Sequence, residues 1–500
     1  MPFDQDKSLA NNNFRLTNQH LLLIGVLLLI GAVRLVTLGW YPLMDKTESR
    51  YAEIGREMVV TNNWITPQID NGVPFWGKPP LSTWLTALSY KVFGINEFAA
   101  RFPSFLLGVI TVFLMFLLGL KLRGSLFGLT AALILASIGL FFIGSGSVMT
   151  DPALLTSVTL SMVSFYFVFS SEEKKFREIW RALFFIGLGL SFIAKGPLGW
   201  VLIAGPIIVW AIVHHQGKNV FNNLFRVTSI LLMLMIALPW YVLAEMKTPG
   251  FLRYFFIEEH WLRFTVSGWK GDLYGNAHAS PKGMILLWAI PATMPWCIIF
   301  IQRIVHLFKR WSLREPLEGN IWVSYLLIWA IFPFIIFMFA SNTLITYVSP
   351  ALPAFALIMA VLLDSTKGVE NVSLRKVILP TALVVPVGFL IVAMTILPII
   401  GWNHSQAATV KTFLALSKDD RGSLVYWGEL PYSAEFYGQG RVIAFKLEDE
   451  AALEREMSDS DEDFFVISDQ HQQRMPPAML NKTVELGRFH KATLRKEFKS

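Results

Sequence analysis

The sequence predicts a polytopic α-helical membrane protein of about eleven transmembrane helices, followed by a small soluble α/β domain. Three observations predict this fold class. The 500-residue chain is 54% hydrophobic and 16% charged, with a mean hydropathy of +0.50, which excludes an ordinary soluble globular protein. Apolar runs of about 20 residues, the length that crosses roughly 30 Å of hydrocarbon, recur over residues 1–400. Charged residues then become frequent from Gly401 onward.

The candidate spans divide the first part of the chain into helices and loops, and we expect about 10–13 helices in all. The candidate spans are 20–40, 99–120, 125–146, 152–170, 181–194, 197–213, 227–246, 283–305, 320–341, 343–363 and 377–400. The fifth and sixth are short and meet at Lys195-Gly196-Pro197, so a single merged span is an alternative interpretation. The first has no small-residue cleavage site before Trp40, which favours a retained span over a signal peptide.

The distribution of Lys and Arg predicts the orientation of the chain. These residues are denser in alternate loops, including 121–123 and 303–314, so we expect a cytoplasmic N-terminus and a periplasmic C-terminal domain. Such loops also account for the net charge of +7, and with no basic domain present we expect no nucleic-acid partner. Two outer loops, 41–98 and 247–282, are too long to be simple connectors, and long loops usually carry function.

Residues 401–500 form the expected second domain, and residues 1–400 form the membrane domain with its two long outer loops. The last hundred residues hold 29 of the 79 charges. Short strand-like runs alternate there with helix-like segments such as Leu447 to Met457. The expected strands are Leu424 to Trp427, Val442 to Phe445, Phe464 to Ile467 and Thr483 to Leu486. This part shows no phosphate-binding loop and no metal-ligand spacing, so the sequence assigns it no chemistry.

Asp45 and Glu48 open the first outer loop, at the start of an expected helix. Apolar residues at helical spacing, with charged residues opposite, predict an amphipathic helix along the membrane surface. Two carboxylates at its start, near the first span, are candidates for catalysis. A capping pattern, Asp followed by Glu three residues later, explains them equally well.

Lys78 and Asp151 are two further charged residues near the expected membrane surface. Lys78 stands in Gly77-Lys78-Pro79-Pro80, where a stiff turn could present a point charge to a lipid phosphate, or the lysine could simply contact headgroups. Asp151 precedes Pro152 at the start of the fourth span, where it could be an N-cap. A carboxylate this close to the bilayer is energetically unfavourable unless it is paired or takes part in function, and this favours a functional role.

The second long outer loop and the tenth span offer three more candidates. His260 and Arg263 are three residues apart, so one helix face could present both to an anionic group. No second histidine follows at metal-binding spacing. Tyr347 opens the tenth span at its outer end, where an interfacial tyrosine needs no function. Cys297 is the only cysteine, which excludes an internal disulfide and a cysteine-based zinc site.

Together these motifs resemble the bacterial lipid-A aminoarabinose transferases and, more widely, the protein O-mannosyltransferases, which are polytopic GT-C glycosyltransferases. The resemblance covers nearly all of the membrane part. The residues that carry it are Thr47-Glu48-Ser49-Arg50-Tyr51-Ala52-Glu53-Ile54, Arg56-Glu57-Met58, Asn63-Trp64 with Pro67, Lys78-Pro79, Phe93-Gly94 through Arg101, Asp151, Glu259-His260-x-x-Arg263-Phe264 and Leu344-x-Thr346-Tyr347.

The resemblance implies a sugar donor linked to undecaprenyl phosphate, possible transfer of 4-amino-4-deoxy-L-arabinose or a related sugar, and an acceptor such as lipid A on the periplasmic side of the bacterial inner membrane. By analogy with the family, one group of residues would bind substrate and a second group would form an acidic centre. The substrate-binding group is Lys78, Arg263 and Tyr347 at the lipid phosphate, with His260 beside it. The acidic centre is Asp45, Glu48 and Asp151, with Arg50 orienting it. Asp45 and Glu48 would bind a divalent cation, Mg²⁺ or Mn²⁺, if one is used.

Three positions depart from the family pattern. Thr47-Glu48 stands where the family often has Asp-Glu, Gly77 replaces an acidic residue before Lys-Pro, and Thr343 replaces a lysine. The exact sugar therefore cannot be carried over. Two other functions stay open, a protein O-glycosyltransferase that uses a polyprenyl-phosphate sugar, and a lipid or solute transporter. The transporter is disfavoured because we find no repeated halves or paired broken spans.

Overall fold

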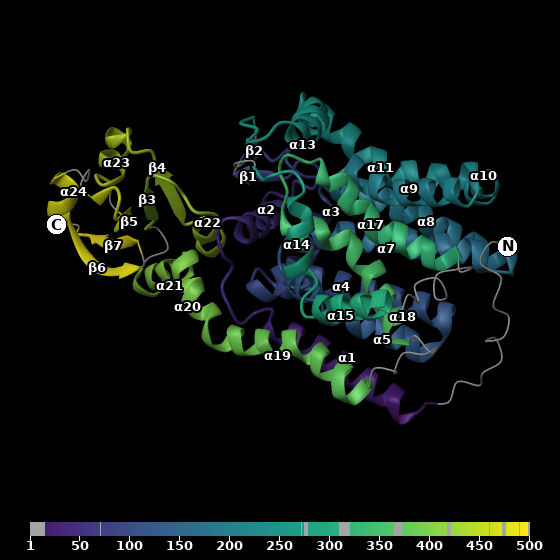
Figure 1. Cartoon of the computed structure of the whole chain (residues 1–500). Coiled ribbons are helices and arrows are strands. Elements are labelled where there is room, and N and C mark those ends of the chain that lie inside the picture. Colours follow the sequence, from purple (N-terminus) through teal and green to yellow (C-terminus); the bar gives the residue numbers. More distant parts are fainter. Residues whose placement is uncertain are drawn as a thin grey trace.

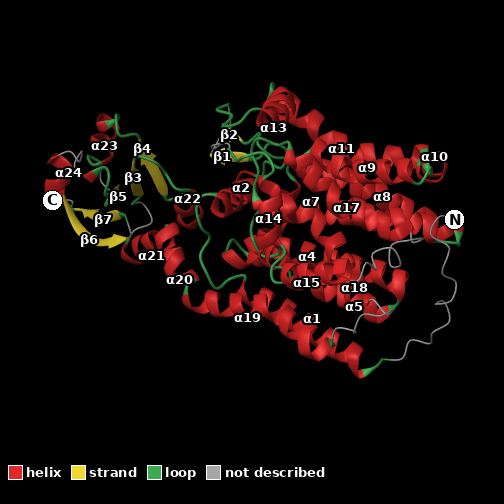
Figure 2. Cartoon of the chain, in the orientation of Figure 1, coloured by secondary structure: helices red, strands yellow, loops and turns green. Residues whose placement is uncertain are grey.

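The computed structural model describes residues 16–70, 72–271, 273–274, 279–309, 321–364, 373–417, 422–459, 461–472, 477–489 and 491–498. Helices make up most of the chain, and the strands lie in a short hairpin and in one sheet near the C-terminus (Figure 2). The C-terminal sheet lies beyond one end of the helical part, joined to it through α20 (Leu397–His404) and α21 (Ala407–Leu416) (Figure 1). Several of the cations used to predict orientation, including Arg314 and Lys367, lie outside the described residues.

The helical part is a multi-pass membrane domain, as the apolar runs predict. Its principal helices are α1 (Asn18–Thr37), α4 (Glu97–Arg123), α5 (Ser125–Ser137), α6 (Gly139–Gly144), α7 (Asp151–Ser170), α8 (Lys174–Lys195), α9 (Pro197–Val213), α10 (Gly217–Leu224), α11 (Val227–Lys247), α14 (Met284–Ala292), α15 (Trp296–Lys309), α17 (Ile321–Met338), η3 (Ile345–Ala351), α18 (Leu352–Asp364), η4 (Leu374–Ile378) and α19 (Leu379–Thr395).

Seven helices in the described part of the chain are long and apolar enough to cross a membrane, or eight if the bent pair α14 and α15 is one span. The other three expected spans are also helical, as α5 with α6, α8 and α9. However, α5 and α9 are short, and α8 begins with charged residues. In the centre lies α7, whose apolar window is 83% buried, and its side chains pack against α4, α8 and α9. This central helix begins at Asp151.

The break between α8 and α9 shows that the fifth and sixth expected spans are separate helices. Gly196 joins them with φ +65°, a left-handed conformation that favours glycine. An added Cβ there would lie 2.7 Å from the Phe255 ring, so the close approach of the second outer loop also requires glycine. The turn therefore holds the end of α8, including Lys195, against residues of that loop.

The first outer loop contains α2 (Thr47–Thr61), the hairpin β1 (Gln68–Asp70) and β2 (Val73–Pro74), and α3 (Leu81–Phe93). Helix α2 forms where the apolar spacing predicts it, but its surface position was predicted wrongly. Its charged residues Glu53, Arg56 and Glu57 are as buried as its apolar ones. They are buried because α3 covers one side of α2 and α22 (Tyr432–Gly438) of the C-terminal part covers another.

The second outer loop is built from α12 (Phe251–Arg253), the π-helix η2 (Tyr254–Leu262) and α13 (Arg263–Thr265). Aromatic side chains of α12 and η2 pack against α8 and α11 in one apolar cluster. Tyr254 and Tyr274 join this loop to the first one, since the Tyr274 hydroxyl donates to Pro74 O at 2.9 Å. Both long loops therefore form one layer over the same ends of the membrane helices.

The C-terminal sheet has the strand order β4-β3-β5-β7-β6, with β3 (Leu424–Trp427), β4 (Val442–Phe445), β5 (Phe464–Ser468), β6 (Thr483–Phe489) and β7 (Ala492–Glu497). Four of these strands begin at the residues that the sequence predicts, whereas β7 was missed. Strands β3, β4 and β5 are parallel, and β7 runs antiparallel to both β5 and β6. Helices α22, α23 (Glu450–Glu456) and α24 (Pro477–Lys482) connect the strands.

Candidate functional site

Asp151 and Lys195 form an ion pair at the start of the central helix. Lys195 Nζ lies 2.8 Å from Asp151 Oδ1, and both side chains are largely buried. The Lys195 ammonium also lies 5.6 Å from the centre of the Tyr347 ring, and all three residues line one small cavity. Asp151 is the first residue of α7, and the N-cap position belongs to Thr150 rather than to Asp151. The structure thus pairs this carboxylate, as its position near the bilayer requires.

Lys78 and Arg263 share one carboxylate, that of Glu259. Arg263 Nη1 donates to both oxygens of Glu259, at 2.8 and 3.0 Å, and Lys78 Nζ binds Glu259 Oε1. Burial raises the pKa of Glu259, but the two cations outweigh it and hold the pKa below the usual range of a glutamate. One buried anion therefore holds two cations from different outer loops side by side.

His260 adopts a role different from that of Arg263, although the sequence predicts a shared face. Its Nδ1 lies 2.7 Å from Phe255 O, five residues earlier in the π-helix, and its Nε2 lies 3.1 Å from Lys195 O. Burial is the main cause that lowers the pKa of His260, opposed by these two carbonyl contacts. His260 therefore links the Glu259 cluster to the backbone of Lys195.

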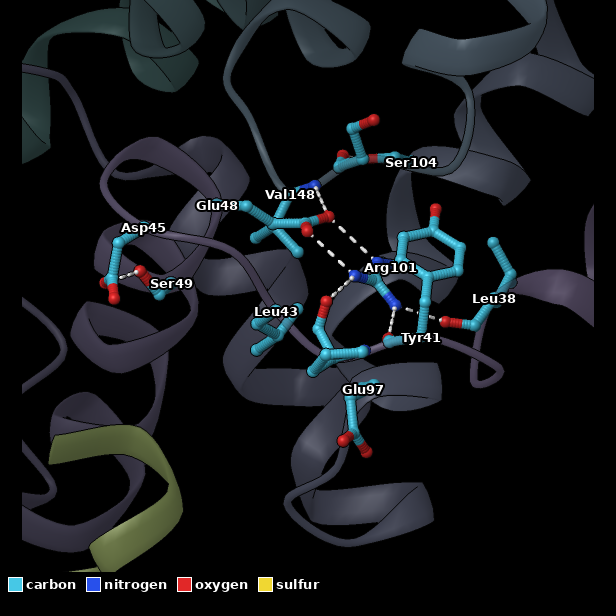
Figure 3. A network of polar contacts seen from close by, with 12 residues as sticks. Leu38, Tyr41, Leu43, Asp45, Glu48, Ser49, Glu97, Arg101, Ser104 and Val148 are labelled. Carbon is cyan, nitrogen blue, oxygen red and sulfur yellow. Dashed lines mark hydrogen bonds and ion pairs between the residues drawn. The ribbon is translucent and has the colours of Figure 1, made fainter. Parts of the chain in front are cut away.

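Glu48 pairs with Arg101 of α4 (Figure 3). Arg101 Nε donates to Glu48 Oε1 at 2.8 Å, and Arg101 Nη2 donates to Glu48 Oε2 at 2.7 Å. The same guanidinium also donates to the carbonyls of Leu38, Tyr41 and Pro42, so all of its polar atoms are engaged. Glu48 Oε1 accepts a further bond from the N–H of Val148, three residues before Asp151.

Asp45 lies apart from Glu48 and contacts the C-terminal part. Its carboxylate accepts hydrogen bonds from Ser49 Oγ at 2.6 Å, from Ser433 N at 2.9 Å and from Ser433 Oγ. The N-cap residue of α2 is Lys46, so the predicted capping role of Asp45 is wrong. Figure 3 shows the Asp45 side chain beside Ser49 and apart from the Glu48–Arg101 pair.

The arrangement of Asp45 and Glu48 does not fit the divalent cation that the resemblance implies. Hydroxyl and amide groups already bind Asp45, and a guanidinium binds both oxygens of Glu48, where a metal would need free carboxylate oxygens. Among the described residues, one group of three potential ligands lies close together, and it stands elsewhere, at Glu456, Asp459 and Asp463. The cation stays a prediction, and no step of the reaction below depends on it.

Arg50 joins the two outer loops. Its Nη1 donates to Tyr274 O at 2.6 Å, and its guanidinium lies 5.2 Å from the centre of the Tyr51 ring and 5.9 Å from that of Phe75. Glu48 is instead oriented by Arg101. Position in the motif favoured Arg50 for that role, but only the packing of α4 against the loop after α1 brings Arg101 to the carboxylate.

Most of the predicted residues are brought together by a continuous series of contacts. Lys78 and Arg263 meet at Glu259, the neighbouring His260 reaches Lys195, and Lys195 pairs with Asp151. Tyr347 completes the cavity beside Asp151, and Glu48 approaches the same region through Val148. Sequence reasoning missed Glu259, Lys195 and Arg101 as site residues. Each stands within a motif that had been noted, but only partner distances reveal what it contacts.

Comparison with known sequences identifies a family model and several relatives. The family model "Dolichyl-phosphate-mannose-protein mannosyltransferase" matches residues 20–255. An undecaprenyl phosphate-alpha-4-amino-4-deoxy-L-arabinose arabinosyl transferase 2 of Pseudomonas fluorescens (strain Pf0-1) is 30% identical over 346 residues, covering 68% of this chain and 58% of that protein. A similarly named transferase 2 of Proteus mirabilis (strain HI4320) is 31% identical, covering 64% of this chain and 55% of that protein. The chain thus spans little more than half the length of these relatives.

Solved structures extend the likeness to the whole chain. The crystal structure of ArnT from Cupriavidus metallidurans bound to undecaprenyl phosphate matches with a TM-score of 0.78 and 19% identity, covering 96% of this chain and 98% of that one. The apo state of the same protein matches with a TM-score of 0.72. At this identity the likeness shows the fold, which includes both the membrane helices and the small C-terminal sheet.

Proposed function

Because the chain belongs to the GT-C glycosyltransferase family, we propose that it moves a sugar from undecaprenyl phosphate to lipid A or another envelope acceptor. The sugar is 4-amino-4-deoxy-L-arabinose or a close relative, as the names of the related transferases suggest. The protein is a multi-pass membrane protein. We further propose the bacterial inner membrane as its location, with the N-terminus in the cytoplasm and the C-terminal domain in the periplasm.

The observation that carries this proposal is the pair of cations that Glu259 holds together, next to Asp151 and Lys195. In the reaction, the bond between the anomeric carbon and the phosphate oxygen breaks, and undecaprenyl phosphate leaves with the electron pair. Lys78 and Arg263 would stabilise this leaving phosphate by charge-assisted hydrogen bonds. Glu259 positions the two cations, and because it neutralises only part of their charge, the cluster retains affinity for an anion.

Asp151 is the proposed base when the acceptor is a hydroxyl. The acceptor oxygen forms the new bond to the anomeric carbon, and its proton passes to the Asp151 carboxylate, a step worth about 10²–10⁴-fold in rate. Lys195 lies beside this carboxylate as its ionic partner and holds it in position. An acceptor phosphate is already anionic and releases no proton. A single direct displacement of this kind inverts the anomeric centre.

Transfer to protein is a second candidate function, favoured by the description of the family model that matches residues 20–255. The same cations would bind the polyprenyl phosphate. The acceptor would be a serine or threonine hydroxyl, for which the Asp151 carboxylate would again accept the proton. The two candidates therefore differ in the acceptor and share the donor.

The deciding experiment is transfer by the purified full-length protein in detergent. We would incubate it with undecaprenyl phosphate-linked 4-amino-4-deoxy-L-arabinose and related donors, and follow by mass spectrometry which acceptor gains a sugar: lipid A, an envelope glycan or a serine-containing peptide. Gain on lipid A supports the main proposal, and gain on the peptide supports the second. Transfer to none of these acceptors from any of the donors would argue against a transferase. Lys78→Ala should abolish transfer, whereas Lys270→Ala, at an exposed lysine of the second loop, should not.

A further inference from the structure

The C-terminal sheet contains a cavity of about 540 Å³, within the range of about 300–1,000 Å³ that is usual for small-molecule sites. Residues at the carboxyl ends of three parallel strands line it, including Trp427 of β3, Lys446 after β4 and Ser468 of β5. Trp402 of α20 lines the opposite part, where the chain enters this domain from the membrane helices. The function proposed above uses none of these residues.

The position of the cavity in the sheet is one where ligands bind. Strand β3 is central to the parallel part, because the chain crosses from β3 to β4 on one side and then returns to β5 on the other. The connection that leaves β3 leads to β4 on one side, and the connection that leaves β5 leads to β6 on the other, so a crevice opens between the carboxyl ends of β3 and β5. In open α/β sheets, such a crevice at a change of direction is the usual binding site.

Two of the residues that line the cavity each have a buried side-chain nitrogen without a partner. Trp427 Nε1 and His471 Nδ1 are shielded from solvent and have no hydrogen-bond partner among the described residues. A buried donor or acceptor without a partner costs about 1–3 kcal/mol, so a ligand that bonds to it is favoured. Gly428, with φ +119°, allows this arrangement, because an added Cβ would lie 3.1 Å from His471 Nδ1.

The side chains of the cavity suit a hydroxyl-rich ring compound. The Trp402 and Phe489 rings lie 5.6 Å apart at 32°, forming an apolar surface on which the C–H face of a sugar could stack. Trp402 is half exposed, so its ring is accessible. The amides of Gln406 and Gln470 both donate and accept hydrogen bonds, as sugar hydroxyls require.

The same residues disfavour a nucleotide or another phosphate ligand. A phosphate site at this place in a doubly wound sheet has a glycine-rich loop leading into a helix N-terminus. Here the loop after β3 is Gly428-Glu429-Leu430-Pro431, with one glycine and an acidic residue just before α22. Lys446 is accompanied by Glu448 in the lining, so the cavity has no strong excess of positive charge.

We propose that this cavity is a saccharide-binding site, and that it holds the sugar headgroup of the acceptor. The role in holding the acceptor rests on the proposed transferase function, whereas saccharide binding rests on the cavity alone. Helix α20 follows α19, the last membrane helix, so a glycolipid could keep its acyl chains in the bilayer while its headgroup reaches Trp402. The site would thereby recruit the acceptor beside the membrane domain.

Binding of free saccharide to the full-length protein in nanodiscs tests the site without requiring transfer. The probe is a glucosamine disaccharide, with adenosine diphosphate as the phosphate-bearing comparison, observed by saturation-transfer NMR and quantified by titration. We expect Trp402→Ala and His471→Ala each to weaken disaccharide binding by about tenfold or more, equal to about 1.4 kcal/mol. Phe498→Ala, at an exposed ring of the same domain outside the cavity, should leave it unchanged.

The outcomes separate the site from the transferase function. If both cavity variants weaken disaccharide binding, and do so in the Lys78→Ala protein as well, the saccharide site is supported even if no transfer is found. If the protein transfers sugar but binds no free saccharide, the proposed saccharide site is wrong and the proposed transferase function is retained. Stronger binding of adenosine diphosphate, or disaccharide binding that neither variant changes, would also overturn the saccharide site. Thermal unfolding of each variant within a few degrees of the parent shows that a loss of binding is not a loss of fold.

Discussion

Arg101 of α4 holds Glu48 of α2 through two parallel hydrogen bonds of 2.8 and 2.7 Å, while its remaining N–H groups bind the carbonyls of the loop after α1. The guanidinium is fully buried. Burial costs an isolated charge much free energy, so the bidentate pair and three carbonyls must together replace its water. One side chain thus fixes the first outer loop against the membrane helices.

Replacing Arg101 should therefore destabilise the protein strongly. Arg101→Ala removes both bonds of the bidentate pair with Glu48 and the donor of three carbonyls, and we expect a loss of about 3–5 kcal/mol, measured by thermal unfolding in detergent. Arg101→Lys keeps the charge but loses the planar fork, so it should recover only part of that stability. Arg123→Ala, at a partly exposed arginine of the same helix, is the control. Full stability of Arg101→Ala would contradict a structural role for the pair.

Lys78 and Arg263 should determine affinity for the lipid phosphate. Lys78→Ala or Arg263→Ala removes a charge-assisted bond of about 1.5–3 kcal/mol, so the Kd for undecaprenyl phosphate should rise by about tenfold or more. Titration of detergent-solubilised protein measures it. Glu259→Gln should also weaken binding, because the two cations lose the anion that holds them together. If Lys78→Ala binds as the parent does, the phosphate lies elsewhere.

The effect of replacing Asp151 on the transfer rate should depend on the type of acceptor. Asp151→Asn keeps the shape of the side chain but cannot accept the proton, so transfer to a hydroxyl should fall by about 10²–10⁴-fold. Transfer to an acceptor phosphate should change far less, because no proton must leave. Initial rates on the two acceptor types, with the same donor, measure the difference. An equal loss on both would assign Asp151 to positioning through Lys195.

The contact between α2 and α22 should weaken as the pH rises. Burial, together with Glu53 and Asp70, raises the pKa of Glu435 to about 8, and Arg56 only partly opposes this. A carboxyl group whose pKa is higher in the folded than in the unfolded state destabilises the fold once the pH exceeds the unfolded value of about 4.3. The resulting loss in the free energy of unfolding grows until about pH 8 and reaches about a few kcal/mol. We expect Glu435→Gln to unfold at the parent's temperature near pH 4.5 and at a higher temperature near pH 8. A constant difference across this range would refute the raised pKa.

Asp45 should hold the C-terminal part in place more than it serves catalysis. Asp45→Ala removes the acceptor of Ser433 N and Ser433 Oγ. The segment 404–406 is attached at the same place, because its first carbonyl accepts from the Asp45 N–H and its last N–H donates to Ser433 Oγ, so this segment should become easier to cleave. Limited proteolysis in detergent measures the rate. Ser433→Ala should give part of the same effect, and residual transfer activity should remain in both variants. Complete loss of transfer with unchanged proteolysis would instead return Asp45 to the acidic centre that the family resemblance implies.

Much of the candidate site was visible in the sequence because charged residues near a bilayer are rare and costly. Asp151, Lys78 and Arg263 stood out for that reason, and the structure brings them into one connected cluster. The pairing of Lys78 with Glu259 was not visible, because 181 residues separate them and no local periodicity relates two loops. The same reason explains why Arg101, at the start of α4, took the place expected for Arg50.

The sequence by itself determined the local features: apolar runs long enough for a membrane, the change of composition at Gly401, and the start of four strands, all of which follow from the side chains of neighbouring residues. Only the tertiary structure decided which charges neutralise one another. It turned the charged side of α2 inward against α22, directed Asp45 to Ser433, and inserted β7 between β5 and β6. Such contacts depend on distances between segments far apart in the chain, and a buried charge accepts whichever partner the fold brings near.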